Sequence, residues 1–438
     1  MRTLSLVLIF LGSTALPTVQ ADWTEFRGPG GQGFVGSANV PLTWSETEHV
    51  AWKTEIAGKA WSSPVVLGQQ IWVTTAITNE PTPEQIEQQF RDSGLTKQQF
   101  ERRQVHGTLS LKAICIDRKD GRLVRDIELF EIDSPEAIHT ANSYASPTPI
   151  IESDRVYCHF GSNGTACLDT TNGHVVWSRK IATNFSVGAG SSPVIYGNVL
   201  VLVCDGIDVQ FITGLDKRTG ETLWTTPRPP IRAPDGQQQK AYSTPLLVQQ
   251  EGRDQYVIPG AQWVVSYDPA TGEELWRFDH GAGFSNVPRP VYGHGMVYIC
   301  TGFGKPELVA IRVDGHGDVT QTHMAWRAKG QIPAKPSPVL VDDLLFVIGD
   351  TGIATCFDAH TGKDLWKRRI GGNYSASPIA TQDRVYFFSE EGDTTVIRAA
   401  PEYAEIATSH VDGKLMASPA VLDSTLFLRS DSQLYRIE

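Results

Sequence analysis

One phrase recurs along this 438-residue chain: CLDTTNGHVVW (167–177), GLDKRTGETLW (214–224), YDPATGEELW (267–276) and CFDAHTGKDLW (356–366). Each copy has an Asp, a Gly four residues later and a Trp four residues after that. An Asp that accepts hydrogen bonds from nearby backbone and a Gly with positive φ predict a tight turn, and the Trp follows on the next strand. The predicted structural residues are Asp169, Gly173, Trp177, Asp216, Gly220, Trp224, Asp268, Gly272, Trp276, Asp358, Gly362 and Trp366.

A second phrase ends in a Pro that opens an apolar, β-rich run. Its copies are WSSPVV at 61, YASPTP at 144, GSSPVI at 190, YSTPLL at 242, VPRPVY at 287, KPSPVL at 335, SASPIA at 375 and MASPAV at 416. Successive copies lie 40 to 52 residues apart, except for 83 between the first two. A period in the forties is the length of one four-stranded propeller blade. We therefore predict an all-β, eight-bladed β-propeller of antiparallel blades over residues 22–438.

The two ends of the chain predict how the ring closes. The last unit stops at LYRIE (434–438), one strand short of a full blade. Near the front, HVAWKTEI (49–56) resembles an isolated outer strand, with Trp52 in the Trp position. Pairing the two would complete the eighth blade and remove an open sheet edge.

Three units depart from the phrase. Arg125 takes the Trp position in the first unit, the fifth unit has Asp318 where Gly is expected, and the seventh (396–410) has no recognisable turn. Such degenerate blades are ordinary in propellers and predict no function.

The long first step contains an insertion at about residues 80–105. Thr82-Pro83-Glu84-Gln85 and Thr96-Lys97-Gln98-Gln99 are two capping boxes, which predict one helix running to Arg91 and a second running through Arg103. The insertion lies in the loop between the second and third strands of blade one, which we expect over the channel mouth. It could dock a partner, act as a lid or simply decorate the surface.

Residues just before each innermost strand should ring one mouth of the central channel. They are Trp61, Tyr144, Tyr242, Asn286, Lys335, Tyr374 and Met416. Aromatic and polar side chains of this kind could form a concave recognition surface. The alternative is that they only fill the channel.

Composition and the N-terminus bound the compartment. Arg2, the apolar run from Leu4 to Leu11 and Val19-Gln20-Ala21 predict a signal peptide over residues 1–21, and therefore a periplasmic or extracellular protein. The apolar run is too short for a membrane span, and no Cys follows the cleavage site to carry a lipid anchor. A net charge of −11 without a basic tract argues against nucleic acid as a partner.

The chain has six Cys, most of which we expect to be small buried residues. Cys158 and Cys167 flank the turn GSNG symmetrically. They could face each other across a hairpin and form a disulfide.

The Asp-x-x-Thr-Gly-x-x-x-Trp repeat resembles the tryptophan-docking motif of the pyrroloquinoline-quinone (PQQ) type propellers. That family includes quinoprotein alcohol dehydrogenases and the non-catalytic propeller of the bacterial outer-membrane barrel-assembly machinery. The opening WTEFRGPGGQG (23–33) also resembles the start of secreted PQQ-like repeat proteins of planctomycete-type bacteria. The resemblance covers residues 22–438 and specifies fold more strongly than activity.

A dehydrogenase of this family would bind PQQ and Ca²⁺, typically beside a disulfide of adjacent Cys. This sequence has no Cys-Cys pair and no haem-attachment Cys-x-x-Cys-His motif, and we identify no catalytic, cofactor-binding or metal-binding residue. The sequence therefore favours a non-catalytic scaffold for protein interaction or envelope assembly, whose partner would be another envelope or extracellular protein. A quinoprotein dehydrogenase of alcohols or sugars and a carbohydrate- or small-ligand-binding module remain the alternatives.

Overall fold

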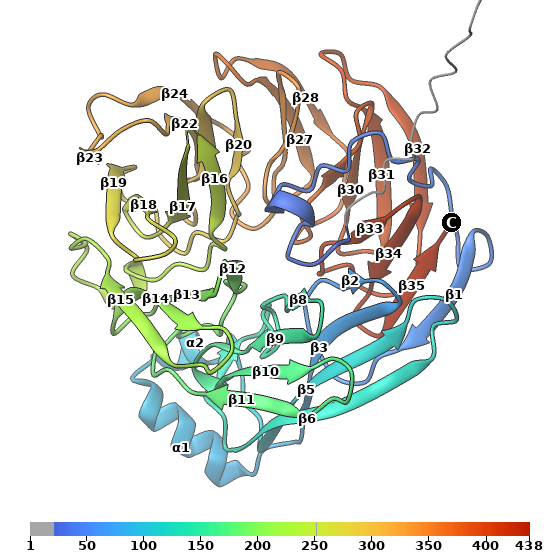
Figure 1. The fold of residues 1–438 in the computed structure, drawn as a ribbon, viewed down its shortest axis with the longest axis vertical. Coiled ribbons are helices and arrows are strands. Elements are labelled where there is room, and N and C mark those ends of the chain that lie inside the picture. The colour runs from blue at the N-terminus through green and yellow to red at the C-terminus, as the bar shows by residue number, and fades with distance from the viewer. Residues whose placement is uncertain (1–21, 251) are drawn as a thin grey trace, which may run out of the picture.

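The computed structural model describes residues 22–250 and 252–438, so the predicted signal peptide lies outside the described residues. Eight sheets, each with four antiparallel strands, are arranged as blades around a central axis, with strand a of each blade innermost and strand d at the perimeter (Figure 1). Alternating strand direction places two kinds of connection on opposite faces. The turn face carries the a–b turns and the Asp–Gly c–d turns, and the loop face carries the b–c loops and the d–a connections. These two names are kept below.

The first four blades follow one another along the chain. Blade 1 contains β2 (Val65–Leu67), β3 (Gln70–Thr78), β5 (Thr108–Asp117) and β6 (Leu123–Asp133). Blade 2 contains β8 (Ile150–Glu152), β9 (Arg155–His159), β10 (Thr165–Asp169) and β11 (Val175–Arg179). Blade 3 contains β12 (Val194–Tyr196), β13 (Val199–Asp205), β14 (Gln210–Asp216) and β15 (Thr222–Pro227). Blade 4 contains β16 (Leu246–Gln250), β17 (Arg253–Pro259), β18 (Trp263–Tyr267) and β19 (Glu274–Asp279).

The last four blades complete the ring. Blade 5 contains β20 (Val291–Gly293), β21 (Met296–Cys300), β22 (Glu307–Arg312) and β24 (Met324–Lys329). Blade 6 contains β25 (Val339–Val341), β26 (Leu344–Ile348), β27 (Ile353–Asp358) and β28 (Asp364–Arg369). Blade 7 contains β29 (Ile379–Ala380), β30 (Arg384–Phe388), β31 (Asp393–Arg398) and β32 (Glu405–His410). Blade 8 contains β33 (Ala420–Leu422), β34 (Thr425–Arg429), β35 (Gln433–Ile437) and β1 (Val50–Glu55).

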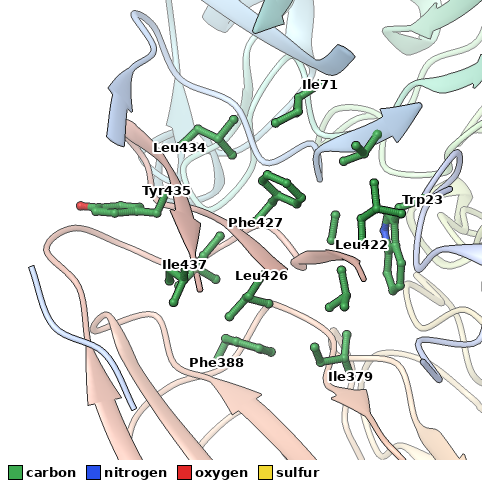
Figure 2. Packing of buried hydrophobic residues seen from close by; sticks show 14 of the residues in the cluster. Trp23, Ile71, Ile379, Phe388, Leu422, Leu426, Phe427, Leu434, Tyr435 and Ile437 are labelled. Carbon is green, nitrogen blue, oxygen red and sulfur yellow. The ribbon is translucent and has the colours of Figure 1, made fainter. Parts of the chain in front are cut away.

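The eighth blade confirms the predicted closure. Strand β1 pairs antiparallel with β35, and Trp52 lies opposite Arg436. Figure 2 shows the core that forms where the two ends of the chain meet, with Trp23 beside Leu422. This pairing joins residues from opposite ends of the sequence and gives blade 8 its fourth strand.

The repeat phrase has a clear physical role in the structure. The Trp of one blade stacks on the turn Gly of the next, so that a Cβ at Gly272 would lie 2.3 Å from the Trp224 ring, and one at Gly362 would lie 2.4 Å from Trp326. The Trp326 indole also donates a 2.8 Å hydrogen bond to the Ala359 carbonyl of the next turn. Arg125, in the Trp position of blade 1, instead donates to the Thr171 carbonyl of blade 2.

The degenerate fifth unit forms an extra pairing. Its turn region supplies β23 (Gly317–Asp318), which adds a parallel fifth strand to blade 4 beside β19. The loss of the Asp–Gly turn thus joins blades 4 and 5 by backbone hydrogen bonds.

A chain of hydroxyls links the innermost strands. In six of the eight steps round the ring, the side-chain hydroxyl of the residue before the proline accepts a hydrogen bond of 2.9–3.0 Å. The donor is the backbone N–H of the equivalent residue in the preceding blade. The acceptors are Thr148, Ser192, Thr244, Ser337, Ser377 and Ser418. This register shows that Pro149, and not Pro147, opens the innermost strand of blade 2. Both prolines of YASPTP fit the phrase, so the sequence pattern alone does not distinguish them.

The N-terminal segment, residues 22–49 and called the plug below, lies across the ring axis at the turn-face ends of the innermost strands. It contains η1 (Pro29–Gly31), the short blue coil at the centre of Figure 1. Trp23 forms a bridge with Val66 of blade 1 and Phe34 with Ala380 of blade 7. From blade 5, the buried Arg289 donates to the Phe26 carbonyl and to Glu25 Oε2 at 2.8 Å. The segment therefore crosses the axis before it reaches β1 at the perimeter.

The helical insertion differs in detail from the prediction. Helix α1 (Pro83–Ser93) begins at Thr82 with the expected capping box, and α2 (Lys97–Phe100) begins at Thr96. The second helix ends at Phe100 and not at Arg103, because the chain then forms β4 (Arg103–Gln104), which pairs with β7 (Ile138–His139). Helix α1 lies at the outer edge of the ring and not over the channel mouth, where we had expected it (Figure 1).

The predicted disulfide is wrong. Cys158 lies opposite Ala166 and Cys167 lies opposite Tyr157, so the two side chains point to opposite faces of blade 2. Each sulfur joins a different interblade core, and all six Cys are buried and free. The symmetric spacing misled because the hairpin register is offset by one residue from the turn centre.

Candidate functional site

The predicted aromatic mouth is mostly interior. Tyr144, Tyr242 and Tyr374 are all buried. The Tyr144 hydroxyl donates to the Glu136 carbonyl and the Tyr242 hydroxyl to the Phe185 carbonyl, each at 2.7 Å. Burial raises the pKa of all three phenols. These rings anchor neighbouring loops and offer no open recognition surface.

The remaining predicted mouth residues are divided. Asn286 is fully buried and donates to the Cys300 carbonyl at 3.2 Å. Lys335 Nζ lies 2.8 Å from Glu390 Oε1, and Met416 is half-buried. Trp61 is partly exposed, donates its indole N–H to the Ala141 carbonyl at 3.2 Å and stacks 5.4 Å from the ammonium of Lys59. Of the predicted set, Trp61, Lys335 and Met416 retain accessible surface.

The carboxylates of this mouth do not suit a calcium–quinone site. Asp350 Oδ1 already accepts hydrogen bonds from the backbone N–H groups of Ala334 and Lys335. Glu390 Oε1 accepts from the Lys335 ammonium and, at 2.6 Å, from the Ser375 hydroxyl. Calcium needs six to eight oxygen ligands, whereas these oxygens face N–H and O–H donors.

A cleft lies between the insertion and the loop face. It encloses about 250 Å³ and is bordered by α1, Ser134–Ala137 and loops of blades 2 to 4. Its lining is rich in side-chain amides and includes Gln88, Gln89, Asn184 and Gln237, together with Arg103 and Glu136. The Arg103 guanidinium fixes one wall, because it donates to the Ser186 carbonyl at 2.6 Å and to the Ser186 hydroxyl at 3.1 Å.

Three cations on this face are half-buried or buried without a counterion. They are Lys59, Arg103 and Lys240, and none has a carboxylate oxygen within 4.0 Å among the described residues. Lys240 Nζ donates to Gln237 Oε1 at 2.5 Å, and Lys59 Nζ donates to Gln104 Oε1 at 3.0 Å. Burial, followed by the nearby Arg103 charge, lowers the pKa of Lys240 to about 8.

These charges have lost part of their hydration and gained only neutral acceptors in return. A carboxylate brought in by a ligand would replace that hydration, so the arrangement favours an acidic partner. Sequence reasoning missed these residues because isolated Lys and Arg in loops carry no motif.

Exposed apolar side chains also mark the loop face. Of the large apolar residues exposed in the described chain, seven lie on outermost strands: Leu123, Val124, Val175, Val176, Leu223, Met324 and Ile406. The other five lie on loops or helices of the loop face: Ile86, Phe90, Val209, Val287 and Phe303. Phe303 is the most exposed, at 62%. A signal existed in the sequence, since a Phe between two Gly in TGFGKP has no strand to pack it.

Apolar residues beside desolvated cations are the composition of a protein-docking surface. The repeated Asp–Gly turns of the opposite face offer no such mixture. Among residues 22–250 and 252–438, no helix combines the length and apolar character that crossing a membrane requires.

Comparison with known proteins identifies the family. The family model described as "Outer membrane protein assembly factor BamB" matches residues 24–226, 260–322 and 317–407. The chain is 25% identical over 290 residues to the outer membrane protein assembly factor BamB of Burkholderia pseudomallei, a match that covers 62% of this chain and 69% of that protein.

Two solved structures share the fold. BamB from Moraxella catarrhalis superposes with a TM-score of 0.57 at 13% identity, over 88% of this chain and 98% of the other. Quinohemoprotein alcohol dehydrogenase from Comamonas testosteroni superposes with a TM-score of 0.60 at 10% identity, over 95% of this chain and 80% of the other. At these identities the superpositions show the propeller fold alone. With its repeats, its closed ring and a family match over most of its length, the chain belongs to the PQQ-like propeller family described as outer membrane protein assembly factor BamB.

Proposed function

We propose that this protein is a non-catalytic propeller scaffold of the cell envelope that docks another envelope or extracellular protein on its loop face. The signal peptide expected at residues 1–21 supports this compartment, and the family to which the chain belongs supports this role. The observation that carries the proposal is that five exposed large apolar side chains lie on loops or the helix of the loop face, Phe303 being the most exposed, whereas the other seven of the described chain lie on outermost strands.

The partner surface should combine apolar residues with carboxylates. Phe303, Val287 and Val209 would supply apolar contact from separate blades, and Arg103 and Lys240 would supply the charges. Because these cations are already desolvated, pairing them costs less hydration free energy than pairing fully exposed lysines would. Separate loops on one rigid ring also limit the conformational entropy lost on docking.

Site-specific photo-crosslinking in the native host tests the proposal. A photoreactive amino acid replaces Phe303 on the loop face or, as the matched control, Asn172 in an exposed Asp–Gly turn. We expect one discrete adduct from position 303 and none from position 172. Equal adducts from both positions, or adducts from position 172 alone, would reject the loop face as the docking surface.

A quinoprotein dehydrogenase is the competing function, because the structures with this fold include quinohemoprotein alcohol dehydrogenases. One experiment separates the scaffold from the dehydrogenase. PQQ and Ca²⁺ are added to the mature protein, the absorbance spectrum is recorded, and dye reduction is assayed with alcohols and aldoses. We expect neither a bound-quinone band nor turnover, and both together would replace the scaffold proposal. Thermal shift with oligosaccharides addresses a carbohydrate ligand in the amide-rich cleft.

A further inference from the structure

Three metal-ligating side chains from two blades meet on the turn face. His294 lies in the a–b turn of blade 5, Asp343 in the a–b turn of blade 6 and His360 in the Asp–Gly turn of blade 6. Asp343 Oδ1 lies 3.5 Å from His294 Nε2 and 3.0 Å from His360 Nε2. The two imidazole rings have centroids 4.2 Å apart. The group is far along the chain and the ring from the insertion and serves no part of the docking surface.

The distances agree with one tetrahedral ion. Imidazole nitrogen and carboxylate oxygen bind Zn²⁺ at roughly 2.0–2.2 Å, so two ligands of a tetrahedral ion lie about 3.4 Å apart. Both nitrogen–oxygen distances are within half an ångström of that value, and all three ligand atoms lie within 4.8 Å of one another. We propose that His294, Asp343 and His360 bind a divalent transition-metal ion such as Zn²⁺ or Ni²⁺, whose remaining positions water would fill.

The backbone positions of the three ligands are already fixed by tight turns. His294 has φ 55° in a two-residue turn between β20 and β21, and Asp342 has φ 47° in the equivalent turn of blade 6. The Ala359 N–H donates to the Asp343 carbonyl at 2.9 Å, which ties the a–b turn of blade 6 to its c–d turn. Only side-chain rotation separates the present arrangement from a metal-bound one.

The contacts that a metal ion would replace are single hydrogen bonds on each imidazole. His294 Nε2 lies 3.0 Å from the Asp342 carbonyl, and His360 Nε2 shares Asp343 with His294. An ion that accepts electron pairs from all three side chains would replace these contacts and join blades 5 and 6 across their interface.

Titration of tag-free mature protein, freed of metal by a chelator, tests the site. Isothermal calorimetry with Zn²⁺ and Ni²⁺ should show one equivalent bound, whereas Ca²⁺, which prefers oxygen ligands, should not bind. Saturation should raise the thermal unfolding midpoint by roughly 2–5 °C. His294→Ala and His360→Ala should each weaken binding at least about 10-fold.

His410→Ala is the matched control, because His410 contacts the exposed carboxylates Asp393 and Asp412 but belongs to no three-ligand group among the described residues. This control should bind metal as the wild type does. All three proposed ligands lie in exposed turns, so their variants are expected to fold, and circular dichroism verifies it. Absence of binding by the wild type, or unchanged affinity in both His→Ala variants, would overturn the proposal.

Discussion

The two faces of the ring are made from different kinds of connection. On the turn face, short repeated turns lie under Trp rings and the N-terminal segment fills the channel, so that Gly272, Gly362 and Trp23 are enclosed by their neighbours. On the loop face, connections differ in length and composition, and Phe303 lies largely in solvent. The difference indicates that the turn face holds the ring together while the loop face is free to vary and to bind.

The largest expected effect concerns the plug. Trp23 is fully buried against the innermost strand of blade 1, so Trp23→Ala should cost about 3–5 kcal/mol of unfolding free energy. Phe303→Ala, on the loop face, should change it by less than about 0.5 kcal/mol. Chemical denaturation measures the free energy of unfolding of both variants. Equal losses of unfolding free energy would show that the turn face does not contribute more to stability than the loop face.

A pair of glycines sharpens the comparison. Gly272 (φ 71°) lies against the Trp224 ring, whereas Gly371 (φ 86°), on the loop face, would place a Cβ in open space. Both Ala variants carry the strain of positive φ, about 1–2 kcal/mol, but only Gly272→Ala must also displace a Trp. We expect Gly272→Ala to destabilise by about 2 kcal/mol more than Gly371→Ala. Similar denaturation midpoints for the two Ala variants would show that the Trp–Gly contact does not stabilise the fold.

Acid should loosen the loop-face side of the ring. His159 and His280, at the loop-face ends of β9 and β19, are fully buried, and burial lowers the pKa of each to about 4. The unfolded chain, whose His titrate near 6.5, binds more protons between pH 6.5 and 4, so stability is complete above about pH 6.5 and falls as the pH drops.

The expected loss at pH 5 is about 1–2 kcal/mol for each histidine. Unfolding free energies of the wild type and of His280→Gln, measured at pH 7.5 and 5.0, check the prediction. The variant should lose less stability than the wild type over this interval. A parallel pH dependence of the two proteins would contradict it.

The sequence predicted the ring because repetition and closure leave regular traces. The Asp–Gly–Trp spacing follows from Trp stacking on Gly in the next blade, and Trp52 could be placed beside β35 because one strand was missing at the other end. The binding surface left no such trace. Tyr144, Tyr242 and Tyr374 have the composition of a recognition site, but loops from neighbouring blades cover them.

The remaining contacts could not be predicted because they join residues that are far apart in the sequence. The charges of Arg103, in the blade 1 insertion, and Lys240, before blade 4, interact because both residues lie on the same side of the ring. Glu25 of the N-terminal segment and Arg289 of blade 5, which form an ion pair, are likewise 264 positions apart in sequence. Single-sequence patterns describe neighbours within a unit and not contacts made across the channel.

The most direct measurement compares complex formation by two surface variants in the native host. Phe90→Ser with Phe303→Ser alters the loop face, and Leu223→Ser with Met324→Ser alters the perimeter at similar exposure. Both double variants should keep unfolding free energies within about 1 kcal/mol of the wild type. The account predicts that the loop-face variant loses the complex with its envelope partner and the perimeter variant keeps it. Retention by the loop-face variant, or equal loss by both, would contradict the account.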